Sequence, residues 1–167
     1  GIYSVVGGFV ILFTFIEQSF TATTQRYLSI ELVKGDKQSI RNVFNTSLLI
    51  YLIVIILLVL MGESIGLWFL NTKMNFPSDR IAAANWVYQF TILTTIWSIF
   101  RAPFNANIIA NEEMSFYAYS SIIEAVLKLL ILGLLIAQPF DKLIVYSILI
   151  FLISAVITLM YVLYSRK

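Results

Sequence analysis

The chain has 167 residues, of which 60% are hydrophobic and only 12% are charged. Soluble domains carry about 25% charged residues, so a soluble globule of this size would lack the charge to cover its surface. The composition therefore predicts an integral membrane protein. The sequence contains no cysteine and no histidine, which excludes disulfides, Ser-His-Asp triads and the usual zinc and haem ligands.

The composition also narrows the possible partners. The net charge is +2, and because no dense basic run accompanies it we expect no nucleic-acid partner. Membrane glycosyltransferases and polymerases commonly need acidic or histidine clusters in sizeable loops, and the sequence has neither. We therefore expect neither enzymatic activity nor a cofactor, and the bilayer itself is the first expected partner.

Charged residues divide the sequence at intervals that match the thickness of a bilayer. A spanning helix needs about 20 mostly apolar residues, and uncharged runs of this length occupy residues 42–62, 81–100 and 143–165. The first apolar run, residues 2–16, is short, so a span there must take Glu17 into the membrane. We expect one all-α transmembrane unit over residues 1–167, with five helices at about 2–27, 40–69, 81–110, 114–138 and 142–164.

Lysine and arginine are unevenly distributed between the two ends of these predicted helices. Seven would lie at one end of the bundle, among them Arg101, and three at the other. Because cytoplasmic loops carry the excess of positive charge, we expect the chain to begin outside and to end in the cytoplasm. Trp68, Tyr161 and Tyr164 fall near span ends, which is typical of interfacial aromatic residues.

Polar residues form a stripe along three of the predicted helices, at the spacing that places side chains on one helix face. The stripe of the third helix holds only if the helix continues past Pro103. The stripes consist of Thr14, Gln18, Thr21 and Gln25 in the first helix; Thr94, Ser98, Arg101 and Asn105 in the third; and Tyr117, Ser121, Glu124 and Lys128 in the fourth.

The charged members of these stripes need an explanation, since an ionisable side chain at the bilayer centre costs about 2.5–3.5 kcal/mol. Glu124 and Lys128 are four residues apart with the acid first, which favours a helical ion pair. They either line a water-filled pathway or form a structural pair between helices. Arg101 is a second pathway candidate or a positive-inside anchor. Glu17 is either a site for a coupling ion or a residue that supports helix packing or lies at the interface.

Several segments of the chain are similar to one family of membrane proteins. The residues resemble those of bacterial polysaccharide-biosynthesis proteins of the O-antigen flippase type. This family belongs to the superfamily of multidrug, oligosaccharidyl-lipid and polysaccharide exporters. The matching segments are GIYSVVGG (1–8), ATTQRYLS (22–29), EL (31–32), KGD (34–36), GLWFLN (66–71), ANWVYQF (84–90), RAPFNANIIA (101–110), YAY (117–119) and IIEAVLK (122–128).

The resemblance implies a fold and a substrate. The fold would be that of the multidrug and toxin extruders, with two six-helix bundles around a cavity. The chain, which starts at Gly1 and ends just past an apolar run, would supply helices two to six of the first bundle as a fragment of a longer protein. The substrate would be an undecaprenyl-pyrophosphate-linked oligosaccharide, moved across the bacterial inner membrane by alternating access. The N-terminus of the chain would then be periplasmic.

Within that hypothesis the polar stripes supply the candidate site residues. Arg101 and Lys128 would hold the pyrophosphate, with Glu124 orienting Lys128. Three amide side chains would bond sugar hydroxyls, and Glu17 would carry the coupling ion. The amide residues are Asn105, Gln18 and Gln25. Two alternatives remain open: a cation-coupled drug exporter of the same superfamily, and a membrane scaffold that transports nothing.

Overall fold

The computed structural model describes residues 2–72, 81–137 and 142–165, with the side chains of residues 15, 18–68, 72, 81–135 and 142–165. Within these residues every regular element is a helix, which confirms the all-α prediction. The elements are α1 (Ile2–Lys34), α2 (Lys37–Met61), the π-helical segment η1 (Gly62–Gly66), α3 (Leu67–Thr72), α4 (Ile81–Ala110), α5 (Met114–Ala137) and α6 (Lys142–Tyr164). Because α2, η1 and α3 follow one another without a break, the described chain has five helices, as expected.

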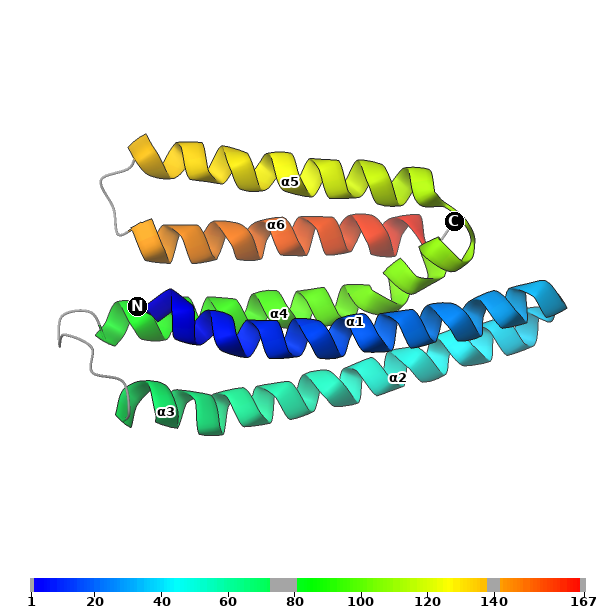
Figure 1. The fold of residues 1–167 in the computed structure, drawn as a ribbon, viewed down its shortest axis with the longest axis horizontal. Coiled ribbons are helices and arrows are strands. Elements are labelled where there is room, and N and C mark those ends of the chain that lie inside the picture. The colour runs from blue at the N-terminus through cyan, green and yellow to red at the C-terminus, as the bar shows by residue number, and fades with distance from the viewer. Residues whose placement is uncertain (1, 73–80, 138–141, 166–167) are drawn as a thin grey trace.

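Helix α4 lies at the centre of the bundle. It packs against α1, α2, α5 and α6, and Figure 1 shows α5 and α6 on one side of it and α2 on the other. Small residues allow this close packing, because Ala84 and Ala106 of α4 are fully buried and Ala102 is nearly so. Helix α4 continues through Pro103, so the expected stripe is not interrupted, although its last turns bend away from the preceding part (Figure 1).

Three helices among the described residues are long and apolar enough to cross a membrane. They are Lys37–Gly66, Met114–Leu135 and Lys142–Tyr164. Large apolar side chains such as Ile53, Leu60 and Leu129 are exposed along them, as expected for surfaces that contact lipid acyl chains. Helix α4 is not in this group, since polar residues interrupt its sequence, and its central position shields those residues from lipid.

The ends of the first two helices differ from the expected boundaries. Helix α1 continues beyond residue 27 to Lys34, and α2 begins at Lys37 rather than at residue 40. The turn between them is set by Gly35, which adopts a φ of 74° and donates its N–H to the Glu31 and Leu32 carbonyls. Asp36 then caps α2 by accepting the Gln38 N–H at 3.0 Å.

The π-helical segment in the second long helix coincides with a side chain inserted from α4. The Tyr88 hydroxyl donates a hydrogen bond of 2.8 Å to the Gly62 carbonyl oxygen. A Cβ atom on Gly66 would lie 1.7 Å from the same hydroxyl oxygen, so only glycine fits there. Side-chain insertion of this kind is a recognised cause of local helix widening.

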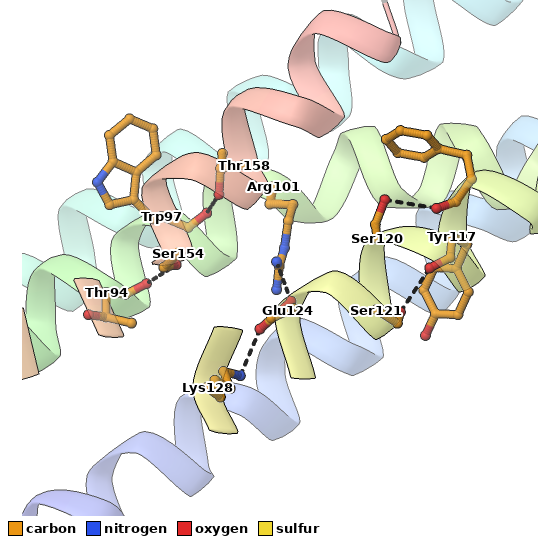
Figure 2. A network of polar contacts seen from close by, with 11 residues as sticks. Thr94, Trp97, Arg101, Tyr117, Ser120, Ser121, Glu124, Lys128, Ser154 and Thr158 are labelled. Atoms are coloured by element: carbon orange, nitrogen blue, oxygen red, sulfur yellow. Dashed lines mark hydrogen bonds and ion pairs between the residues drawn. The ribbon is translucent and has the colours of Figure 1, made fainter. Parts of the chain in front are cut away.

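Helix α6 is held against α4 by hydroxyl groups. The Thr158 hydroxyl donates to the Trp97 carbonyl oxygen at 3.2 Å, and the Ser154 hydroxyl approaches the Thr94 carbonyl oxygen at 3.5 Å (Figure 2). Thr158 is completely buried. Hydroxyl-to-carbonyl bonds between membrane helices add about 0.6–2 kcal/mol each, so these contacts fix α6 beside the polar stripe of α4.

Candidate functional site

The predicted ion pair on α5 is present and lies at the middle of that helix. Lys128 Nζ donates to Glu124 Oε1 at 2.7 Å. Helix α5 has 24 residues, Met114–Ala137, and its midpoint falls between Glu124 and Lys128. The Lys128 side chain is 49% exposed and that of Glu124 is 22% exposed, so the ammonium is the accessible member of the pair.

Arg101 reaches the same carboxylate from α4. Its Nη1 donates to Glu124 Oε2 at 3.0 Å, so Glu124 accepts from a different cation on each oxygen. Figure 2 shows Arg101 extending from α4 to Glu124, with Lys128 on the opposite side of the carboxylate. The structure thus brings together three of the predicted site residues. Two cations face one carboxylate, so among the described residues one positive charge of this group has no paired acid.

An aromatic ring from α6 also contacts Arg101. The Arg101 guanidinium carbon lies 5.5 Å from the centre of the Tyr161 ring, within the range of a cation–π contact. Tyr161 is only 4% exposed and meets the Phe116 ring edge-on, with the centroids 5.3 Å apart. The expectation that Tyr161 is an interfacial aromatic residue is therefore wrong, because its ring is buried between helices.

The spacing of polar residues in α6 is a sequence signal for this role of Tyr161. Four α6 residues are spaced by seven, four and three positions and so share a helix face. All four are buried. They are Ser147, Ser154, Thr158 and Tyr161. Buried polar and aromatic side chains at this spacing indicate a face packed against protein rather than lipid.

Asn105 follows Arg101 by one turn of α4. Its Oδ1 atom is buried, and none of the described residues donates a hydrogen bond to it. A buried acceptor without a donor costs about 1–3 kcal/mol. Asn105 therefore holds a buried acceptor one helical turn from Arg101, suited to a hydroxyl or amide donor.

The residues predicted from the first helix do not join this group through any contact in the described part of the chain. Gln18 is exposed and Gln25 is partly buried, and neither forms a hydrogen bond with the cations or with Glu124. The side chain of Glu17 lies outside the described residues. The buried face of α1 contains Thr24 and Leu28 instead, and the Thr24 and Tyr51 hydroxyls lie 3.4 Å apart.

We call Arg101, Glu124, Lys128 and Tyr161 the cation cluster. A planar guanidinium and an ammonium that share a carboxylate are suited to binding an anion, since phosphate oxygens can accept from both. The half-exposed Lys128 gives such an anion access. No family model, curated protein or solved structure matches the chain.

Proposed function

We propose that the chain is part of a flippase that moves undecaprenyl-pyrophosphate-linked oligosaccharides, the repeat units of O-antigen or capsule, across the bacterial inner membrane. The observation that carries this proposal is the cation cluster at the middle of α5, where two cations share one carboxylate and, among the described residues, pair with no second acid. A pyrophosphate that crosses hydrocarbon needs fixed positive charge along its path. Arginine and lysine together supply that charge with directed N–H donors.

The exposure of Lys128 supports a pathway rather than a structural pair. Its side chain is 49% exposed at mid-helix, where contact with acyl chains would cost about 2.5–3.5 kcal/mol. Tyr117 and Ser121 of the same stripe are also exposed. This face of α5 therefore requires polar surroundings, such as a water-filled cavity or the remaining helices of a longer transporter.

The positive charge of the cation cluster favours this proposal over the drug-exporter alternative. Exporters of cationic drugs favour acidic residues in their binding cavities. Here Glu124 is engaged by two cations, Arg101 and Lys128, so the cluster would repel a cation and attract an anion.

We place the five helices as helices two to six of the first bundle of a transporter with two six-helix bundles, with α1 and α4 crossing the membrane as well. The N-terminus would be periplasmic and the C-terminus cytoplasmic. Asn105 would accept from sugar hydroxyls beside the pyrophosphate. Gln18 and Gln25 would do so after α1 moves toward the cluster, and Glu17 would hold the coupling ion. One bundle would rock against the other to expose the cluster to each side in turn.

The proposal is tested in bacteria that depend on the full-length protein for surface polysaccharide. Arg101→Ala and Lys128→Ala are expected to abolish surface polysaccharide while the amount of protein in the membrane stays normal. Lys34→Ala is the matched control, because Lys34 is exposed and pairs with Glu31 at a helix end, away from the cluster. Normal polysaccharide in both cluster variants would refute the proposal. Loss of drug resistance in place of polysaccharide would indicate the exporter.

A further inference from the structure

A cationic pocket lies at one end of the bundle, and none of the residues that line it belongs to the cation cluster. The turn between α1 and α2, the turn between α4 and α5 and the end of α6 all lie toward this end (Figure 1). The pocket has a volume of about 280 Å³. Its lining consists of Lys37, Ile40, Arg41 and Phe44 of α2, Asn107 of α4 and Ser165 after α6.

Two cations of the pocket point from the same face of α2. Lys37 and Arg41 are four residues apart, so their side chains are neighbours on the helix. Both are exposed, and in the described part of the chain neither is in an ion pair with an acid. The carboxylate nearest in sequence is that of Asp36. It accepts a hydrogen bond as the N-cap of α2 and does not line the pocket.

The polar wall opposite these cations offers a further donor. The Asn107 amide donates to Ser165 Oγ at 3.1 Å. The main-chain and side-chain oxygens of Asn107 accept from the Asn111 amide at 2.8 and 3.2 Å. Ser165 Oγ accepts the Asn107 proton, and no acceptor for its own hydroxyl proton is present among the described residues, so this proton can point into the pocket.

The position and lining of the pocket favour a lipid over a small soluble anion. The candidate membrane span of α2 begins at Lys37, so in a bilayer Lys37 and Arg41 would lie at about the depth of the lipid headgroups. Ile40 and Phe44 form an apolar wall beside the cations, and the Phe44 ring is held edge-on by Phe104 with the centroids 5.6 Å apart. A soluble phosphate would gain nothing from that wall, whereas the glycerol backbone of a lipid would pack on it.

We propose that this pocket binds the phosphate of an anionic phospholipid from the adjoining leaflet. Lys37 and Arg41 pair with the phosphate, and the Ser165 hydroxyl donates to one of its oxygens. Ile40 and Phe44 contact the glycerol backbone. Basic pockets between helices at the cytoplasmic side of membrane proteins hold anionic headgroups in this way. The pocket shares no lining residue with the cation cluster. The lipid-binding proposal can therefore be tested independently of the proposed flippase activity.

The test measures lipid binding to the purified protein in detergent by native mass spectrometry. Phosphatidylglycerol is compared with phosphatidylcholine and with glycerol 3-phosphate as a soluble phosphate. We expect phosphatidylglycerol to bind to the wild-type protein more tightly than phosphatidylcholine. The double variant K37Q/R41Q should bind it about 25-fold more weakly, because each cation near the headgroups contributes about fivefold. Glycerol 3-phosphate should bind neither protein.

Two further double variants serve as controls for the lipid-binding measurement. The double variant R26Q/K34Q removes the same charge from exposed residues of α1 that do not line the pocket, and it should bind phosphatidylglycerol like the wild type. The variant K37R/R41K keeps both charges and should also retain binding, which would attribute the loss in K37Q/R41Q to the missing charges. Equal binding by K37Q/R41Q and R26Q/K34Q would overturn the proposal. Binding of glycerol 3-phosphate as tight as that of the lipid would overturn the assignment to a lipid.

Discussion

Arg101 of α4 and Glu124 of α5 form an ion pair across two helices, with Arg101 Nη1 3.0 Å from Glu124 Oε2. Both side chains are shielded, with 19% and 22% of their surfaces exposed. The same carboxylate holds Lys128 through its other oxygen. Glu124 therefore positions the cations of the candidate site and also ties α5 to the centre of the bundle.

This pair should contribute measurably to stability. A double-mutant cycle of Arg101→Gln and Glu124→Gln is expected to give a coupling energy of about 0.5–3 kcal/mol in the free energy of unfolding. The measurement is unfolding of the purified protein in mixed micelles. The cycle of Lys128→Gln with Glu124→Gln is the comparison, and it should give a smaller coupling because Lys128 is 49% exposed. A coupling near zero between Arg101 and Glu124 would contradict the structural role.

Only part of the cation cluster could be predicted from the sequence. The pairing of Glu124 with Lys128 follows from helical spacing, since residues four apart are neighbours on any helix. The pairing of Glu124 with Arg101 depends on how α4 and α5 pack. Periodicity predicts that each helix turns its polar stripe away from lipid, but it does not predict which stripes meet. The α1 stripe illustrates this limit, because Gln18 has the same periodicity and is exposed.

The insertion of Tyr88 beside Gly66 leads to a second prediction. Gly66→Ala should lower the free energy of unfolding by about 1–3 kcal/mol, because the new methyl group would lie 1.7 Å from the Tyr88 hydroxyl oxygen. Adding Tyr88→Phe should relieve only part of this loss, since the ring carbon Cζ would still be 2.8 Å away. Both effects are measured by thermal unfolding of the purified protein.

Gly133→Ala is the matched control for this substitution. A methyl group at Gly133 of α5 would meet nothing within 4 Å, so Gly133→Ala should leave stability unchanged or raise it slightly. If Gly66→Ala were as stable as Gly133→Ala, the close packing of Tyr88 against Gly66 would be wrong.

The helix ends show a different limit of sequence reasoning. Hydropathy predicts which residues lie within the membrane, but a helix can continue beyond those residues. The expected end of the first helix near residue 27 was wrong, because Arg26, Glu31 and Lys34 are good helix formers outside hydrocarbon as well. The actual stop is Gly35, which takes the left-handed conformation that favours glycine. Asp36 then starts α2, a capping signal that was present in the sequence.

The Asp36 cap predicts a dependence of stability on acidic pH. Hydrogen bonds from the Ser39 hydroxyl and then from the Gln38 amide hold the pKa of the Asp36 carboxyl below its ordinary value of 3.8. A lowered pKa in the folded state means that the ionised cap stabilises the turn above pH 3.8 and that this stabilisation is lost as the pH falls through the folded pKa.

Thermal unfolding of wild type and Asp36→Asn between pH 2 and pH 6 measures this effect. Asparagine also caps helices but carries no charge. The melting temperature of the wild type should therefore exceed that of Asp36→Asn near pH 6, and the difference should close toward pH 2. Ser39→Ala removes the largest cause of the lowered pKa, so the difference should then close at a higher pH. A constant difference across the pH range would contradict the prediction.

The arrangement of the helix ends predicts which residues are accessible from each side of the membrane. Lys34, at the end of α1, and Ser115, at the start of α5, lie toward one end of the bundle; Thr72 of α3 and Lys142 of α6 lie toward the other (Figure 1). All four side chains are exposed. The excess of lysine and arginine lies toward the end with Lys34, so that end should be cytoplasmic.

Single cysteines test this orientation directly, because residues 1–167 contain no cysteine. In intact spheroplasts a membrane-impermeant maleimide should label Thr72→Cys and Lys142→Cys, whereas Lys34→Cys and Ser115→Cys should react only after the membrane is permeabilised. The unmodified chain should not be labelled under either condition. The reverse pattern would show that the positive-inside assignment is wrong. Labelling of all four cysteines in intact spheroplasts would show that these helices do not span the membrane, since only a spanning bundle can hide one pair of ends while exposing the other.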